Sequence, residues 1–137
     1  MVSKKYAKLD ALFSEYIRRR AIQRVGGCER CLTHKYDIQK EDSSIFPAYK
    51  QLQCSHFIGR SRSSVRFDPD NACGLCGACH LYLMAHPLEH TEFFKQRLGR
   101  NLDLLMARMR IIGIDQKAIE LYLEEKIKQL EVNNVMR

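Results

Sequence analysis

The stretch CSHFIGRSRSSVRFDPDNACGLCGACH, residues 54–80, decides how the rest of this chain is organised. It places His56 near its start, continues through an arginine-rich loop, and turns at Asn71. A cysteine pair and a second histidine follow, at Cys76, Cys79 and His80. Side chains that bind metals and side chains that move protons are therefore gathered in one short stretch.

The hydrophobic pattern divides this stretch into a strand, a loop and a helix. Residues 51–58 alternate between apolar and polar side chains and predict a short strand. A basic loop follows over 59–67, and the Asp-Pro-Asp-Asn sequence at 68–71 predicts a turn. The residues from the cysteine pair to about Ala85 predict a helix.

A second cysteine pair, Cys28 and Cys31, has the same two-residue gap as Cys76 and Cys79. Together the pairs supply the four thiolates of a tetrahedral structural zinc site, which we predict here. The zinc would clamp the base of the long loop between the pairs.

Two cysteines, Cys54 and Cys73, are left over. Cys73 precedes Cys76 by three residues and is an alternative zinc ligand. Packing in the core is the favoured role for both, because a free cysteine behaves as a small apolar residue.

The flanking segments predict amphipathic helices. Residues 4–24 carry one apolar stripe, and Gly26-Gly27 ends this helix. Further helices are expected after Pro87, between Leu102 and Gly113, and after an N-cap at Asp115. The buried stripes of the first and last helices are Leu9, Leu12, Phe13, Tyr16 and Ile17, and Ile119, Leu123, Ile127 and Leu130. The polar residues 33–50 predict a surface excursion.

The composition is that of a soluble globular protein. At 137 residues, with 45% hydrophobic and 28% charged residues, the chain can form one domain with its own core. No apolar run approaches the roughly 20 residues that span a bilayer, and the N-terminus is unlike a signal peptide. We therefore expect a cytoplasmic protein with no membrane partner, whose CxxC pairs bind metal. The net charge of +7 favours a polyanionic partner.

The histidines and Asn71 fit the needs of phosphodiester hydrolysis. That reaction needs a base to activate water, a divalent ion to stabilise the leaving oxygen, and cations to hold the phosphate. His56 is the candidate base, because a neutral imidazole is available near pH 7. Asn71 would orient that imidazole through a hydrogen bond. His80, held by the cysteine pair, would bind a catalytic Mg²⁺ or Mn²⁺ ion.

Two groups of arginines are candidates for DNA contact. The loop between the two halves of the site is expected to grip phosphates through Arg60, Arg62 and Arg66. On the first helix, a solvated face and a phosphate-binding face are equally good interpretations of Arg18, Arg19 and Arg20.

The combined pattern resembles the HNH, or His-Me finger, endonucleases, and more narrowly the NinG/Rap recombination proteins of lambdoid phages and prophages. The segments that carry the resemblance span most of the chain: DALFSEYIRRR, CERC, SHFIGR, VRFDPDN, CGAC and FFKQRLG. The resemblance implies an α+β, mostly helical fold with a small zinc-stapled ββα-metal core between amphipathic helices. It also implies cleavage of branched DNA, such as Holliday junctions and D-loops, by a phage or prophage protein in a bacterial cytoplasm.

By this resemblance His56 matches the general base, Asn71 the central asparagine, and the four paired cysteines the zinc ligands. The chain departs from the pattern at Ser55, where many HNH enzymes carry a metal-binding aspartate. The second protein ligand of the catalytic ion is therefore open.

Two further histidines lie beyond the cysteine pair. His86 is a candidate extra ligand of the catalytic ion. His90 shares a helical stripe with Phe94 and Leu98, so a core position is expected for it.

We expect one domain over 1–137: a basic helix over 1–27, a zinc-bound HNH core over 28–86, and C-terminal helices over 87–137. A homodimer is expected, because four-way junctions are two-fold symmetric. The C-terminal helices would form its interface unless their stripes pack on the first helix.

Two other functions compete with a DNA endonuclease. A non-catalytic zinc-ribbon module that binds nucleic acid explains the cysteines and the charge, but not the spacing of His56, Asn71 and His80. A structural zinc domain that recruits recombination partners through its C-terminal helices is the third interpretation.

Overall fold

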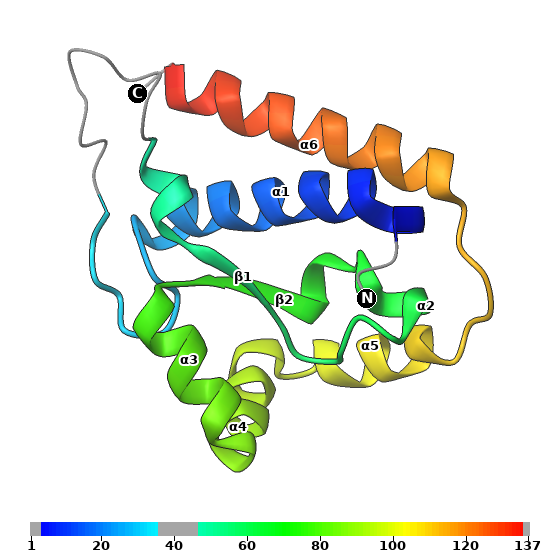
Figure 1. Cartoon of the computed structure of the whole chain (residues 1–137), viewed down its shortest axis with the longest axis horizontal. Helices are drawn as coiled ribbons and strands as arrows, with labels where there is room; N and C mark the ends of the chain where they lie inside the picture. Colours follow the sequence, from blue (N-terminus) through cyan, green and yellow to red (C-terminus); the bar gives the residue numbers. More distant parts are fainter. Residues whose placement is uncertain (1–3, 36–46, 136–137) are drawn as a thin grey trace.

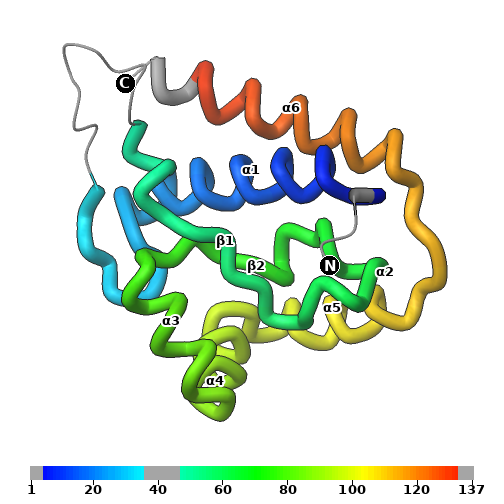
Figure 2. Tube along the Cα trace, in the orientation of Figure 1, coloured from blue at the N-terminus to red at the C-terminus, as the bar shows by residue number. Residues whose placement is uncertain are grey.

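A computed structural model describes residues 4–35 and 47–135 of the chain and shows a mostly helical α+β fold (Figure 1). A long helix, α1 (Ala7–Val25), lies between a two-stranded sheet and a second long helix, α6 (Gln116–Val135). Three shorter helices lie beyond the sheet: α3 (Gly77–Ala85), α4 (Pro87–Leu98) and α5 (Asn101–Met109). Figure 2 follows the same path as a tube.

The first helix forms as its apolar stripe predicts. Leu9, Phe13, Tyr16 and Ile17 are buried, and Leu12 is half-buried. A 3₁₀ turn at Lys4–Tyr6 precedes the helix. Gly26 ends it in the left-handed conformation, with φ of 71° and its N–H bonded to the Ile22 carbonyl.

The last helix packs against the first, and the two run parallel (Figure 1). Leu123, Ile127 and Leu130 join the apolar cluster of α1. Two ion pairs join the helices, Lys8 with Glu120 and Arg19 with Glu131. The residue numbers rise together along both helices, as a parallel arrangement requires. This stripe of α6 is therefore covered by α1 and does not serve as the expected dimer interface.

Asp115 is the N-cap predicted for the last helix. Its carboxylate accepts a hydrogen bond from the backbone N–H of Ala118 at 3.0 Å. Pro87 and Gly99 likewise bound α4 as expected, whereas α5 ends at Met109, before Gly113.

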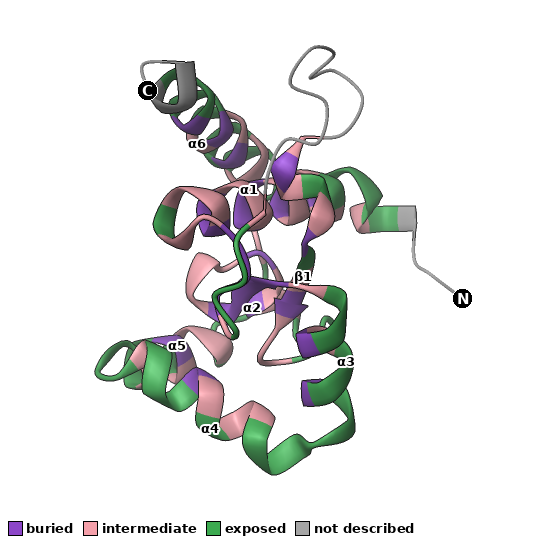
Figure 3. Ribbon diagram, turned by 90° about the vertical axis from the view of Figure 1, so that its left-hand side faces the viewer, coloured by how far each residue is buried: buried purple, intermediate pink, exposed green. Residues whose placement is uncertain are grey.

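The sheet consists of β1 (Gln53–His56) and β2 (Ala72–Leu75), which pair antiparallel with His56 opposite Ala72. It lies in the buried centre of the molecule, whereas the outer faces of α3 and α4 are exposed (Figure 3). The strand predicted over 51–58 is shorter than expected, because a 3₁₀ turn (Ala48–Gln51) precedes it. The residues of β2 are all buried, so they show no polar alternation.

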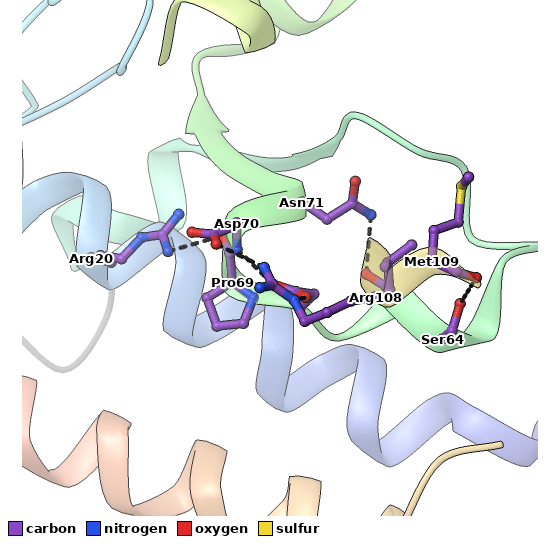
Figure 4. A network of polar contacts seen from close by, with 9 residues as sticks. Arg20, Ser64, Pro69, Asp70, Asn71, Arg108 and Met109 are labelled. Atoms are coloured by element: carbon purple, nitrogen blue, oxygen red, sulfur yellow. Dashed lines mark hydrogen bonds and ion pairs between the residues drawn. The ribbon is translucent and has the colours of Figure 1, made fainter. Parts of the chain in front are cut away.

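The predicted turn at 68–71 is a 3₁₀ turn, Pro69–Asn71, held from two sides (Figure 4). The Arg20 guanidinium donates to the carbonyls of Pro69 and Ala72, at 3.0 and 2.8 Å. Arg108 of α5 pairs with Asp68 and Asp70. The end of the loop is thereby fixed to both α1 and α5.

The basic loop over 59–67 contains a short helix that the sequence did not predict, α2 (Ser63–Arg66). Its Ser64 hydroxyl donates to the Met109 carbonyl of α5 at 2.7 Å (Figure 4). The surface excursion expected over 33–50 lies mostly outside the described residues. Among the described helices, none is long and apolar enough to cross a membrane.

We expect Gly74→Ala to lower the free energy of unfolding by about 1–3 kcal/mol, measured by chemical denaturation. A Cβ at Gly74 would lie 2.7 Å from the Cβ of Ala21, because α1 approaches β2 closely there. Gly77→Ala is the control, since its Cβ would meet only the Gln53 amide at 3.5 Å. Equal stability of the two variants would contradict the close packing.

Candidate metal centre and active site

The four paired cysteines converge on one point. The sulfur atoms of Cys28, Cys31, Cys76 and Cys79 all lie within 4.8 Å of one another. Tetrahedral zinc with bonds of about 2.3 Å requires sulfur atoms about 3.8 Å apart. The Cys31 and Cys76 sulfurs are 3.8 Å apart. The predicted cluster is confirmed, and its geometry fits a zinc ion.

Each pair forms a tight turn that directs backbone N–H groups at sulfur. The Arg30 N–H lies 3.4 Å from the Cys28 sulfur, and the Cys79 N–H lies 3.4 Å from the Cys76 sulfur. Hydrogen bonding with Thr33 lowers the pKa of the Cys31 thiol to about 6, whereas burial raises the pKa of the Cys79 thiol to about 12 in the absence of metal. Hydrogen bonds to sulfur favour the thiolate, which is the form that binds zinc.

A buried carboxylate fixes the upstream cysteine pair to the sheet. Glu29 accepts a hydrogen bond from the Gly74 N–H at 2.6 Å, while its own N–H donates to the Gly74 carbonyl at 2.9 Å. Its other oxygen accepts from Arg97 of α4 at 2.6 Å. The side chain has no exposed surface, so these partners replace the water that its carboxylate oxygens lose on burial.

The two remaining cysteines lie outside the cluster. Burial raises the pKa of Cys54 to about 12 and raises that of Cys73 well above its ordinary value. Both are therefore neutral thiols that pack against other side chains, as the favoured interpretation expects.

The candidate active site is a cavity of about 690 Å³. The fold brings His56 from the end of β1 and His80 from the first turn of α3 to its wall. The charged side chains that also line it are Asp10, Arg18 and Arg60. Two of the three residues predicted for catalysis thus line one cavity.

His56 is held in one tautomer by a backbone carbonyl. Its Nε2 lies 3.0 Å from the Arg66 oxygen, and a carbonyl can only accept, so Nε2 carries the hydrogen. Nδ1 is then the nitrogen that can take up a proton. The ring packs on Phe13 of α1, with centroids 5.4 Å apart. Burial lowers the pKa of His56, which keeps the ring neutral near pH 7.

Asn71 does not orient the imidazole directly, so that part of the prediction is wrong. Its amide nitrogen donates to the carbonyls of Ile58 and Val65, at 2.9 and 3.1 Å. Its oxygen accepts from the Ile58 N–H at 2.8 Å. The fully buried carboxamide therefore closes the loop that follows His56 and acts on the imidazole only through that loop.

His80 follows the last cysteine and is placed by it. Its Nδ1 lies 2.5 Å from the amide oxygen of Gln53, so this nitrogen carries the hydrogen. Nε2 retains a lone pair that can bind a metal ion. Burial lowers the pKa of His80, which favours the neutral, metal-binding form.

The other two histidines of this region have different positions. His86 stacks on Tyr82, with ring centroids 4.0 Å apart, and is not among the residues that line the cavity. The cavity therefore gives no support to His86 as an extra ligand. His90 packs edge-on against Phe94 but is only half-buried, so it lies at the border of the core and not within it. Its Nε2 lies 3.1 Å from the His56 carbonyl.

The arginines predicted to contact DNA fall into two groups. Some line the cavity or are exposed, and the others are buried or paired with protein groups. Arg62 is exposed, and Arg18 and Arg60 line the cavity. Arg18 donates to the Ser14 carbonyl of its own helix at 3.1 Å, and Arg60 lies 3.8 Å from the Asp10 carboxylate, so each is only partly engaged. Arg20 is buried against backbone carbonyls, so its predicted phosphate contact is wrong. Arg19 stacks on Tyr49 and pairs with two glutamates, Glu15 and Glu131.

Arg66 is also occupied. Its guanidinium forms a two-pronged ion pair with Asp10 of α1, and only 11% of its side chain is exposed. Arg66 thus does not offer the phosphate grip predicted for it. No local spacing relates Asp10 to the histidines, so sequence reasoning missed this residue.

Comparison of the chain with protein-family models, with curated proteins and with solved structures finds no match.

We expect the purified protein to contain one zinc ion per chain, and Cys28→Ser to lose it. Because structural zinc contributes about 10 kcal/mol to the folding of small domains, the loss should cost at least about 3 kcal/mol of stability. Metal analysis and thermal unfolding measure both effects. Cys73→Ala removes a buried sulfur outside the cluster and should retain zinc. Retention of zinc by Cys28→Ser would contradict the site.

Proposed function

We propose that this chain is a metal-dependent DNA endonuclease of the HNH type. The observation that supports this most is the arrangement of His56 and His80 in one cavity. Each ring has one nitrogen bonded to a neighbouring oxygen, which leaves the other for chemistry. The sulfur cluster beside His80 supplies the rigid scaffold that such a site needs.

The roles of the residues follow from their positions. His56 takes a proton from the attacking water at Nδ1, and its Nε2–H remains on the Arg66 carbonyl. Arg18 and Arg60, which both line the cavity, hold the phosphate. His80 is the protein ligand of a Mg²⁺ or Mn²⁺ ion. When bound, that ion stabilises the departing 3′ oxygen.

The proposed substrate is branched DNA, such as a Holliday junction or a D-loop. This part rests on the resemblance to the NinG/Rap proteins of phages and prophages, which also implies a bacterial cytoplasm. Recognition would depend on shape and backbone charge, since the cavity offers arginines and no stacking platform for bases. A homodimer would match the symmetry of a junction.

One observation favours the alternative of a non-catalytic zinc module that binds nucleic acid. Ser55, at the position of the usual metal-binding aspartate, is buried with only 2% of its surface exposed. Strand β1 thus provides no carboxylate for a catalytic ion. A cleavage assay separates the two functions.

We expect the protein to nick a synthetic four-way junction in the presence of Mg²⁺ or Mn²⁺. His56→Ala should reduce the rate by about 10²–10⁴-fold, because it removes the base. His86→Ala is the matched control, since this histidine stacks on Tyr82 outside the cavity. If wild type and His56→Ala bind the junction equally and neither cleaves it, the binding module is the correct function.

The pH dependence gives a second test. Burial lowers the pKa of His56 below its ordinary value of 6.5, and only the neutral ring accepts a proton. The cleavage rate should therefore rise with pH on the acid side and reach half of its plateau value at a pH below 6.5. A single-turnover rate that is still rising above pH 7.5 would show that a group other than His56 is the base.

A further inference from the structure

A continuous set of contacts joins an acidic side chain on α1 to the proposed base. The Asp10 carboxylate accepts two hydrogen bonds from the Arg66 guanidinium, at 2.9 and 2.6 Å. The backbone carbonyl of the same arginine lies 3.0 Å from Nε2 of His56. Arg66 therefore connects the two residues: its guanidinium binds Asp10, and its backbone carbonyl binds His56.

Arg66 is held too firmly to be a mobile surface arginine. Its third nitrogen donates to the Arg60 carbonyl at 3.1 Å, and its guanidinium lies 5.0 Å from the ring centroid of Tyr6. A two-pronged arginine–carboxylate pair fixes direction as well as distance. Position 66 is also the last residue of α2, so fixing its side chain fixes the end of that helix.

Asp10 supplies a carboxylate among the described residues that line the cavity, although not at the position of Ser55. The Asp10 side chain is 18% exposed and lines the cavity that contains His56 and His80. Both of its oxygens face Arg66, so the carboxylate is engaged in this ion pair. Helix α1 thereby brings a negative charge to the cavity that β1 does not supply.

We propose that Asp10 is a positioning residue of the active site, which fixes the carbonyl of Arg66 and, through it, the tautomer and orientation of the His56 ring. The effect of Asp10 on catalysis rests on the endonuclease function proposed above. Its effect on the imidazole does not, because the contacts exist without substrate.

The charge of Asp10 has a second effect, because it raises the pKa of His56. Arg60 and Arg66 on the loop lower the pKa of His56, and Asp10 raises it, all less strongly than burial lowers it. Other charged or titratable groups that line the cavity or contact His56 are Arg18 of α1, Cys54 of β1, His80 of α3 and His90 of α4. Loss of the Asp10 charge would therefore lower the pKa of His56 further.

The test compares Asp10→Asn with Glu15→Gln. Glu15 also lies on α1 and also pairs with an arginine, Arg19 at 3.0 Å, but both members of this pair belong to α1. Nitrogen-15 NMR of the full-length, zinc-loaded protein reports the tautomer and pKa of His56. Cleavage of a four-way junction reports kcat and KM.

We expect wild type and Glu15→Gln to show the Nε2–H tautomer, and Asp10→Asn to show a mixture of both tautomers with a lower pKa. Asp10→Asn should lower kcat by at least about 10-fold with KM unchanged, and Asp10→Glu should recover most of the loss. An Asp10→Asn protein with the wild-type tautomer and pKa would overturn the proposal. So would a change confined to KM.

The role of Asp10 can still be tested if Asp10→Asn does not fold or if wild type does not cleave DNA. If Asp10→Asn fails to fold or loses zinc, Arg66→Lys replaces it, since lysine keeps the backbone carbonyl and the charge but not the two-pronged pair. That variant should show the same mixed tautomers, and a wild-type tautomer would refute the proposal. If wild type does not cleave DNA at all, the endonuclease is wrong, while the NMR comparison still decides the role of Asp10.

Discussion

The convergence of four cysteine sulfurs is the constraint on which the rest of this structure depends. It joins the turn after α1 to the turn between β2 and α3, two segments that are distant in the sequence. Glu29 extends the junction by bonding both backbone groups of Gly74. Because His80 directly follows Cys79, the same junction sets the position of one wall of the cavity.

A second constraint acts on the opposite wall. The buried Asn71 carboxamide closes the loop after His56, and Arg20 and Arg108 fix the turn that contains Asn71. Asp10 and Arg66 then hold the end of α2 against α1. The cysteine cluster and this loop network are separate sets of contacts, and the cavity lies between them. In the proposed enzyme, the residues that build the scaffold thus differ from the residues that line the cavity.

Much of the fold could be predicted because its signals are local. The stripe of α1, the glycine at its end and the cap at Asp115 each depend on neighbours within one or two turns. The cysteine pairs were equally clear, since their spacing reflects ligand geometry. Strand β2 could not be recognised from alternation, because both of its faces are buried.

The candidate site was only partly predictable, because its arginines are sorted by long-range contacts. Arg18 and Arg20 are two residues apart, yet one lines the cavity and the other is buried under the turn at Pro69. A signal for Arg20 did exist: it lies three residues after Ile17, beside the apolar stripe. The pairing of Asp10 with Arg66 has no such signal, since it depends on how the loop folds back onto α1.

The central claim is that the cysteines hold a scaffold metal and the histidine cavity holds a different, catalytic one. Anomalous X-ray scattering from crystals grown with zinc and then soaked in Mn²⁺ tests this most directly. We predict a zinc peak between the four sulfurs and a manganese peak beside Nε2 of His80, in the cavity lined by His56. Zinc between the sulfurs with no manganese in that cavity would contradict the claim.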